Sequence, residues 1–298
     1  MTTVRVAVPR KGRPLEAVLE RLAARTDTAA LADDVISTLQ YEKAITKDNQ
    51  EADADVYDRL AAYSDTDEPS APEYTLLRDD RAGMPRRIVF DSLTLPLDDF
   101  DLQLVGREEP FRALRTHEFA LGFDSADLVL EEVVGLDPEP LRELADVNDR
   151  IDPRDTDVRV VSGLGDTVWH TLLATPDLRR AYDADLDRSL VDAYEGDICI
   201  SPRYERLVEA VLGTDVIEDV EFTYPEEGTI EEAAIAETGI GVYLTVTGST
   251  ARDHGLELGE RLFPSETVLL ENAAERSAAT ERAADLFVGA DLETELAP

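Results

Sequence analysis

The feature that most constrains the fold is a strand, a loop and a helix in immediate succession at the start of the chain. Apolar and polar residues alternate over Val4–Val8, which predicts a buried strand. Pro9–Arg13 then form a loop. The next apolar residues recur at helical spacing, at Leu15, Val18, Leu19 and Leu22. A strand followed at once by a helix is typical of α/β proteins, so the sequence predicts that class.

The same alternation of elements continues along the chain. In the first part we expect strands at 87–90, 102–105 and 119–123 and a helix at 110–115. Residues from about 40 to 85 are polar and irregular, with a loop signal of Asp, Pro and Ser at 65–72. We therefore predict a polar insertion, about 40–85, on the surface of the first lobe.

A second set of elements begins near Asp157. We expect strands at 158–161, 168–174, 197–200, 220–222, 241–246 and 267–270, and helices at 203–212, 231–237 and 274–287. A chain of 298 residues is long enough to bury two separate cores. The sequence therefore favours two lobes over one large domain.

The charge of the chain is strongly acidic and evenly spread. It has 66 acidic and 29 basic residues, a formal net charge of −37, and its lysines are Lys11, Lys43 and Lys47. At molar salt the screening length falls to about 3 Å, so self-repulsion fades and carboxylates keep the surface hydrated. We interpret the charge as adaptation to high salt. An acidic disordered tail would concentrate the charge in blocks and lack the 43% hydrophobic residues.

Composition also bears on location and partners. Cys199 is the single cysteine, which excludes an internal disulfide and suits a reducing cytoplasm. No apolar run has the length of a signal peptide or of a membrane span, about 20 residues, so we predict a cytoplasmic protein without membrane contact. The acidic field repels a phosphate backbone, which disfavours nucleic-acid partners.

His117, His170 and His254 lack metal-ligand spacing, and we expect them, like Trp169, to be structural.

The cation loop, residues 9–13, is the first candidate for chemistry. It places Arg10, Lys11 and Arg13 around Gly12, between a strand and a helix. Backbone N–H groups at such a turn can hold a phosphate, and the helix N-terminus adds a favourable field. The alternative is that three surface cations pair with nearby carboxylates, and the spacing matches no strict phosphate-binding motif.

The hydroxyl loop, Thr247–Thr250, is the second candidate. Its hydroxyl groups surround Gly248 directly after a predicted strand. Hydroxyls and successive backbone N–H groups can bind a 5′-phosphate without any cation. A threonine-rich tight turn is the equally open alternative.

The chain resembles the ATP phosphoribosyltransferases. Residues 6–13 resemble the opening of that family, which has a strand, then proline, a variable residue and Lys-Gly-Arg. Further matches follow in the family's order, at Leu121–Asp127, Ser162–Gly165, Gly228–Glu231, Thr247–Thr250, Asp253–Leu256 and Ser265–Leu270. Apart from the insertion, the resemblance spans about residues 4–272.

The resemblance implies a fold of two periplasmic-binding-protein-like lobes with a cleft between them. On that plan residues 1–132 plus 243–298 form lobe I, and residues 133–242 form lobe II. The C-terminal ferredoxin-like domain of long family members has no counterpart, because 28 residues follow Leu270. Feedback inhibition through that domain is therefore not expected.

The resemblance also implies an activity, that of a pentosyltransferase in the first step of histidine biosynthesis. Such an enzyme moves the phosphoribosyl group of phosphoribosyl pyrophosphate (PRPP) to N1 of ATP, with Mg²⁺, and releases pyrophosphate. Lys11 and Arg13 would stabilise charge on the leaving pyrophosphate, while Gly12, Asp127 and the hydroxyl loop (Thr247, Gly248, Ser249 and Thr250) would bind substrate. The family further implies a homo-oligomer and small-molecule ligands.

Two departures from the family concern the ribose. The family's two acids before the hydroxyl loop correspond to Gly239 and Tyr243, so both carboxylates are missing. Carboxylates accept hydrogen bonds from ribose hydroxyls, and their loss should weaken that half of the site. We hypothesise that Glu231, in the preceding helix, takes over part of this role.

Two other functions remain open at this stage. A paralogue that kept the fold but lost catalysis would bind PRPP or a nucleotide as a regulatory or sensing protein, and the missing acids favour it. A solute-binding protein of a transporter would share the lobes. That last class ranks third, because the sequence lacks an export signal and a lipidation cysteine.

Overall fold

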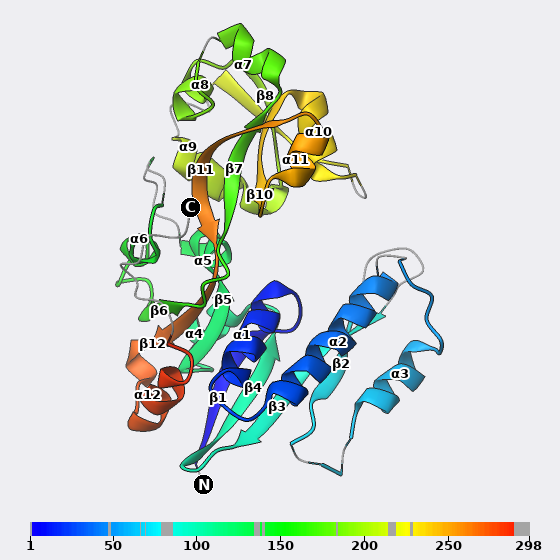
Figure 1. The fold of residues 1–298 in the computed structure, drawn as a ribbon. Helices are drawn as coiled ribbons and strands as arrows, with labels where there is room; N and C mark the ends of the chain where they lie inside the picture. Colours follow the sequence, from blue (N-terminus) through cyan, green and yellow to red (C-terminus); the bar gives the residue numbers. More distant parts are fainter. Residues whose placement is uncertain are drawn as a thin grey trace. The chain divides into compact units, whose positions relative to one another are not determined.

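Strand β1 (Thr2–Pro9) lies inside the larger sheet of the structure, as its apolar residues predict (Figure 1). This computed structural model describes residues 2–46, 49–65, 67–68, 70–78, 86–133, 138, 141–182, 184–213, 219–226 and 229–288. β1 pairs in parallel with β4 (Phe100–Arg107) along its whole length and with β5 (Leu121–Ser125) at Val6 and Ala7. Both faces of β1 are buried over Val6–Val8, as is usual for parallel strands, whereas Arg5 is exposed.

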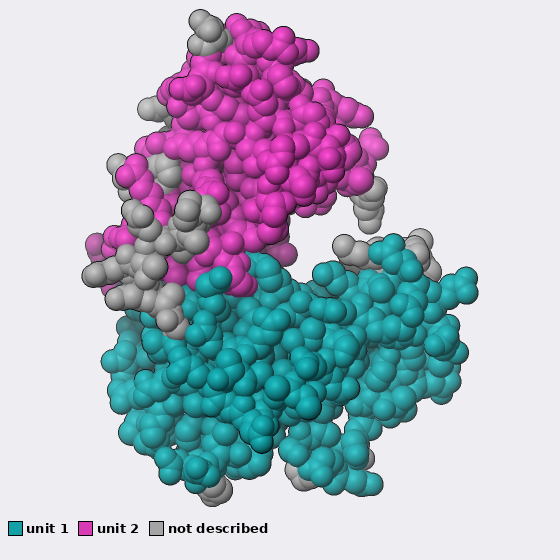
Figure 2. All heavy atoms as spheres, viewed as in Figure 1, with its two compact units in different colours: residues 1–124, 156–165, 267–291 teal, residues 125–155, 166–266, 292–298 magenta. Residues whose placement is uncertain are grey.

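The chain divides into two units (Figure 2). Unit 1 comprises residues 1–124, 156–165 and 267–291, and unit 2 comprises residues 125–155, 166–266 and 292–298. Each unit contains one sheet with helices packed on it, so the predicted α/β class is confirmed.

Unit 1 contains a seven-stranded sheet in the order β2-β3-β4-β1-β5-β12-β6. The strands not yet given are β2 (Glu73–Arg78), β3 (Arg86–Pro96), β6 (Val158–Gly163) and β12 (Thr267–Asn272). Its helices are α1 (Arg13–Ala23), α2 (Ala29–Thr46), α3 (Val56–Tyr63), α4 (Pro110–Arg115), α12 (Ala278–Asp285) and the short 3₁₀ turn η3 (Ala273–Glu275). Residues of α1, α2 and α12 share one apolar cluster with β1, β3 and β4, while α4 packs on β1 and β12.

Unit 2 contains a five-stranded sheet in the order β11-β7-β10-β8-β9. Its strands are β7 (Val168–Ala174), β8 (Gly196–Ile200), β9 (Val220–Thr223), β10 (Ile240–Thr245) and β11 (Glu257–Ser265). Its helices are α5 (Ala126–Val133), α6 (Leu144–Asp149), α7 (Pro176–Tyr182), α8 (Arg188–Asp192), η1 (Pro202–Tyr204), α9 (Glu205–Leu212), α10 (Glu231–Thr238) and α11 (Ser249–Asp253). Trp169 is buried, as expected of a structural residue, and Cys199 is buried as well.

The boundaries between the units differ from those expected. Residues 243–266 lie in unit 2, because β10 and β11 both pair antiparallel with β7. Residues 156–165 lie in unit 1, because β6 pairs with β12. Strand pairing between segments far apart in the sequence decides both assignments. Such pairing cannot be inferred from the local sequence pattern.

The expected polar insertion is more regular than predicted. Residues 38–46 continue helix α2, and a second helix, α3, follows. β2 then pairs antiparallel with β3 at the edge of the sheet. Part of the segment, including residues 79–85, lies outside the described residues. The polar composition reflects the exposed faces of these elements.

Candidate functional site

The cation loop connects β1 to α1 in unit 1. Gly12 caps the helix with φ 82°, a left-handed value that favours glycine. Its carbonyl accepts hydrogen bonds from the N–H groups of Leu15 and Glu16, at 3.1 and 3.2 Å. Arg13 and Pro14 begin the helix, and Pro14 suits this position because it lacks an N–H. The backbone of the loop is thus fixed by the start of an eleven-residue helix.

The cations of this loop have different environments. Arg10 is paired through Nη1 with Oδ1 of Asp91 at 3.0 Å and through Nε with Glu108 at 3.6 Å. Its carbonyl also accepts the N–H of Phe90, which ties the loop to β3. Lys11 is exposed and makes no ion pair with the described residues. Arg10 therefore fits the alternative in which the cations of the loop pair with nearby carboxylates. Lys11, in contrast, is available to bind an anion.

The hydroxyl loop follows β10 in unit 2. Thr247, Ser249 and Thr250 are exposed, and the hydroxyls of Thr247 and Ser249 are 3.0 Å apart. Nη2 of Arg252 donates to the carbonyl of Thr247 at 2.7 Å. Hydroxyl donors gathered at an exposed turn beside a guanidinium can bind a phosphate.

Gly248 determines the shape of this turn. It has φ 68°, and its backbone is buried. A Cβ added here would lie 2.3 Å from Cδ2 of Leu258 on β11. The left-handed backbone therefore favours glycine, and a side chain here would also have to displace the Leu258 side chain.

Glu231 lies next to Tyr243, a position at which the resemblance implies an acid. Glu231 begins α10, and Tyr243 lies on β10, which packs against that helix. The Tyr243 hydroxyl donates a hydrogen bond to the Glu231 carboxylate, and burial together with that charge raises the pKa of Tyr243. A carboxylate is thus present beside β10, on a different element from the one expected.

Gly239, the other departure, ends helix α10. It has φ 104° and its N–H donates to the carbonyl of Ile235 at 2.7 Å. An acid at this position would need a left-handed backbone that side chains rarely adopt. The helix cap accounts for the glycine in this chain.

Asp127 occupies a different environment from the one expected of a substrate-binding residue. It is 2% exposed, and its Oδ2 lies 3.0 Å from Nε2 of His170. The His170 ring stacks on Phe263 and meets Tyr204 edge-on. Burial raises the pKa of Asp127, but hydrogen bonds from His170, Ser125 and Tyr204 outweigh it and hold that pKa at about 2. Asp127 is therefore an ionised part of the unit 2 interior, fully occupied by protein partners.

The structure sorts the predicted site residues between the units. Lys11, Gly12 and Arg13 belong to unit 1, whereas Glu231 and the hydroxyl loop belong to unit 2. Sequence reasoning missed Arg252, which fixes the Thr247 carbonyl. Its signal was a lone basic residue two positions after the hydroxyl loop in an acidic chain.

In the described ranges, no three His, Cys, Asp or Glu side chains gather closely enough to hold a metal ion. His170 is buried in the structural environment expected for it, and His117 pairs with Glu275 at 3.0 Å. Across those same ranges, no helix has the length and apolar character needed to cross a membrane.

Solved structures that match the chain include an ATP phosphoribosyl transferase (HisG:HisZ) complex from Thermotoga maritima, with 14% identity, a TM-score of 0.40, and coverage of 95% of this chain and 94% of the other. YhfZ from Shigella flexneri has 10% identity, a TM-score of 0.42 and coverage of 97% and 85%. A glycine betaine/carnitine/choline ABC transporter has 7% identity, a TM-score of 0.39 and coverage of 95% and 83%.

No curated protein sequence matches the chain. The family described as halobacterial ATP phosphoribosyltransferase matches it over residues 1–298, which is its full length. This match includes both the cation loop and the hydroxyl loop. The chain therefore belongs to the halobacterial ATP phosphoribosyltransferase family.

Proposed function

We propose that the protein joins the phosphoribosyl group of PRPP to N1 of ATP. In this reaction the bond between C1′ of the ribose and N1 of the adenine forms, the bond between C1′ and the pyrophosphate oxygen breaks, and pyrophosphate leaves. The observation that supports it best is the exposed Lys11 just before helix α1, which has no ion-pair partner among the described residues, in a family of ATP phosphoribosyltransferases. A fixed cation there stabilises the charge that develops on the leaving group.

In this proposal each group of site residues binds a different part of the substrate. Lys11 and Arg13 bind the pyrophosphate, and Gly12 lets the backbone approach it. Thr247, Ser249 and Thr250 donate hydrogen bonds to the 5′-phosphate, with Gly248 setting the turn. Glu231 accepts hydrogen bonds from the ribose hydroxyls in place of the missing acids. No nucleophilic side chain is needed, because N1 of ATP attacks directly.

Mg²⁺ is proposed to enter as part of the substrate, held by the phosphate oxygens of PRPP. The described residues do not supply a group of ligands that fits the ion, since no three acidic or histidine side chains converge. No step of the proposal depends on a protein-bound metal. A homo-oligomer and a cytoplasmic location stay predictions from the sequence.

The test is pyrophosphate release by the purified protein with PRPP, ATP and Mg²⁺ in molar KCl. We expect release to need both substrates, and Lys11→Ala to lower kcat/KM about 100-fold, as expected for loss of one charge-stabilising group. Arg154→Ala, at a side chain 92% exposed, is the matched control and should leave the rate unchanged. Equal rates for the Lys11→Ala variant and the parent would contradict the role of Lys11.

Glu231→Ala tests the ribose hypothesis in the same assay. We expect the KM for PRPP to rise about tenfold, because a hydrogen bond to a charged group contributes about 1.5 kcal/mol or more. Tyr243→Phe removes only the protein partner of Glu231 and should raise KM less. An unchanged affinity in the Glu231→Ala variant would end the hypothesis.

The sensing alternative rests on the missing acids at Gly239 and Tyr243. PRPP binding by titration calorimetry, without any pyrophosphate release, would favour that function. In that case Lys11→Ala would weaken binding alone. Absence of PRPP binding in the parent protein would overturn both functions.

A further inference from the structure

Arg261, on β11 of unit 2, is a cation that the proposed reaction does not use. It is exposed, in a chain with 66 acidic and 29 basic residues, yet its side chain makes no ion pair or hydrogen bond with the described residues. The acids of the same strand have other partners: Glu257 pairs with Arg179 at 2.5 Å, and Glu260 pairs with Arg188 at 3.4 Å. The Arg261 guanidinium therefore has its charge and its donors available for an anion.

The ring of Trp169 holds this guanidinium in place. Cζ of Arg261 lies 5.6 Å from the centre of the ring, within the range of a cation–π contact. Trp169 is 8% exposed, and its Nε1 is buried without a hydrogen-bond partner in the described part of the chain. An unpaired buried donor is destabilising, and phenylalanine would avoid it. Because tryptophan attracts cations better than the other aromatic rings, its contact with Arg261 accounts for the indole here.

Strand pairing brings Arg261 to the face of the sheet that carries a proposed ribose residue. β11, β7 and β10 are neighbours in the unit 2 sheet (Figure 1). Thr171 on β7 pairs with Arg261 on one side and with Tyr243 on the other, and side chains directly opposite each other share a face. Strands are about 4.8 Å apart, so about 10 Å separates the Cα atoms of Arg261 and Tyr243. Tyr243 in turn donates to Glu231.

The same face leads to the hydroxyl loop. Trp169 pairs with Thr245, whose hydroxyl donates to the Trp169 carbonyl at 3.2 Å, and the loop begins two residues later at Thr247. The register of β11 on β7 shifts on both sides of Arg261. Such irregularities re-aim side chains and are common next to active sites. Contacts within unit 2 thus connect Arg261 with both groups proposed to bind PRPP there.

The triphosphate of ATP is the anion that lacks a cation in the proposed reaction. Lys11 and Arg13 are proposed to bind the pyrophosphate of PRPP, and the hydroxyl loop its 5′-phosphate. N1 of ATP must approach C1′ of the ribose, so the acceptor lies next to the ribose and therefore close to Glu231. A guanidinium on the adjoining part of the same sheet face can form paired hydrogen bonds with phosphate oxygens.

We propose that Arg261, positioned by Trp169, binds the triphosphate of ATP and so makes the protein favour a nucleoside triphosphate as acceptor. The identity of the acceptor rests on the proposed function. Arg261 contacts the acceptor away from the reacting atoms, so its loss weakens the binding of ATP and leaves the contacts to PRPP in place.

Pyrophosphate release in molar KCl with Mg²⁺ tests this role. Arg261→Gln should raise the KM for ATP at least about tenfold, which corresponds to about 1.4 kcal/mol, and change the KM for PRPP less than about twofold. Arg261→Lys keeps the charge but loses the paired donors, so it should recover part of the affinity. Arg154→Gln, in the same unit and 92% exposed, is the matched control and should leave both KM values unchanged. A rise in the KM for PRPP alone would overturn the proposal.

The fluorescence of Trp169, the single tryptophan of the chain, provides a readout that does not depend on turnover. Because Arg261 lies over its ring, a phosphate that draws the guanidinium away should change the emission. We expect a saturable change with ATP and with inorganic tripolyphosphate, and none with adenosine. Arg261→Gln should weaken the response to both phosphates at least about tenfold. A response to adenosine without one to tripolyphosphate would show that the ring contacts the base, and the proposal would be wrong.

The two assays separate this proposal from the proposed function. If ATP and tripolyphosphate bind through Arg261 but the parent releases no pyrophosphate, the triphosphate site stands and the transferase proposal fails. If the parent releases pyrophosphate and Arg261→Gln keeps both its KM for ATP and its fluorescence response, the transferase proposal stands and the role of Arg261 is refuted.

Discussion

At the scale of single residues, Asp127 has a structural role inside unit 2. A carboxylate matched to the family by sequence is buried in unit 2 and shared among His170, Ser125 and Tyr204. These hydrogen bonds keep it ionised despite burial. Its role is to hold η1 and β7 to the start of α5, since Tyr204 and His170 lie on those elements.

We expect Asp127→Asn to destabilise the protein by about 3 kcal/mol at neutral pH, because it leaves His170 and Tyr204 without their charged partner. The folded pKa of about 2 lies below the ordinary 3.8. The contribution of the carboxylate is therefore complete above about pH 4 and is lost as pH falls toward about 2.

Urea unfolding of parent and variant across this range checks both points. The difference in unfolding free energy should be constant above about pH 4 and shrink below it. Asp152→Asn, at a half-exposed carboxylate, is the control and should show no such change. A difference that does not vary with pH would contradict the assigned ionisation.

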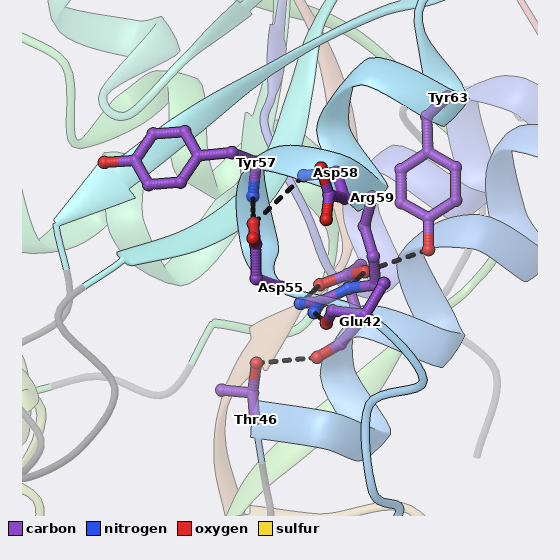
Figure 3. Close-up of polar contacts among 8 residues, drawn as sticks. Glu42, Thr46, Asp55, Tyr57, Asp58, Arg59 and Tyr63 are labelled. Atoms are coloured by element: carbon purple, nitrogen blue, oxygen red, sulfur yellow. Dashed lines mark hydrogen bonds and ion pairs between the residues drawn. The ribbon is translucent and has the colours of Figure 1, made fainter.

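At the scale of elements, a buried charge pair and a tyrosine hydroxyl attach α3 to α2. The side chains of Glu42 and Arg59 are 4% and 11% exposed (Figure 3). Asp55 caps α3 by accepting the N–H groups of Tyr57 and Asp58, at 2.7 and 3.1 Å. α3 has no fully buried residue, but Val56, Leu60 and Tyr63 pack partly buried against the core, so the charge pair adds to these apolar contacts.

Arg59→Ala should cost about 3 kcal/mol, because it leaves the Glu42 carboxylate buried without a partner. Hydrogen exchange should show faster exchange in α3 before any change in β1. Arg180→Ala, which breaks an exposed pair with Asp177, is the control and should cost under about 1 kcal/mol. Unaltered protection of α3 in Arg59→Ala would show that other contacts hold the helix.

At the scale of the whole molecule, the net charge of −37 opposes folding in dilute buffer. The screening length falls from about 10 Å at 0.1 M salt to about 3 Å at 1 M. We therefore expect Tm to rise steadily from dilute to molar KCl. Sucrose at equal osmolarity is the control and should raise Tm less. A Tm independent of KCl would contradict the interpretation of the charge as salt adaptation.

Some features of this protein follow from the sequence alone, because they depend on local patterns. Apolar spacing predicted β7 at 168–174 and α4 at 110–115 with the bounds that the structure shows. The strand, cation loop and helix at the start were predicted in the same way. The family membership follows from motifs in a fixed order, and the full-length match confirms it.

Other features depend on contacts between distant segments. β11 was not predicted, because Gly259 and Pro264 interrupt its pattern and its pairing with β7 is irregular; an edge strand tolerates such residues. The buried residues of α2 have helical spacing, but one of them is Glu42, whose burial depends on Arg59. Asp127 is buried because His170 and Tyr204 supply partners. The sequence by itself determined the α/β class, the family and both loops, whereas the tertiary structure decided which charges are buried and which strands share a sheet, because partners distant in sequence set both.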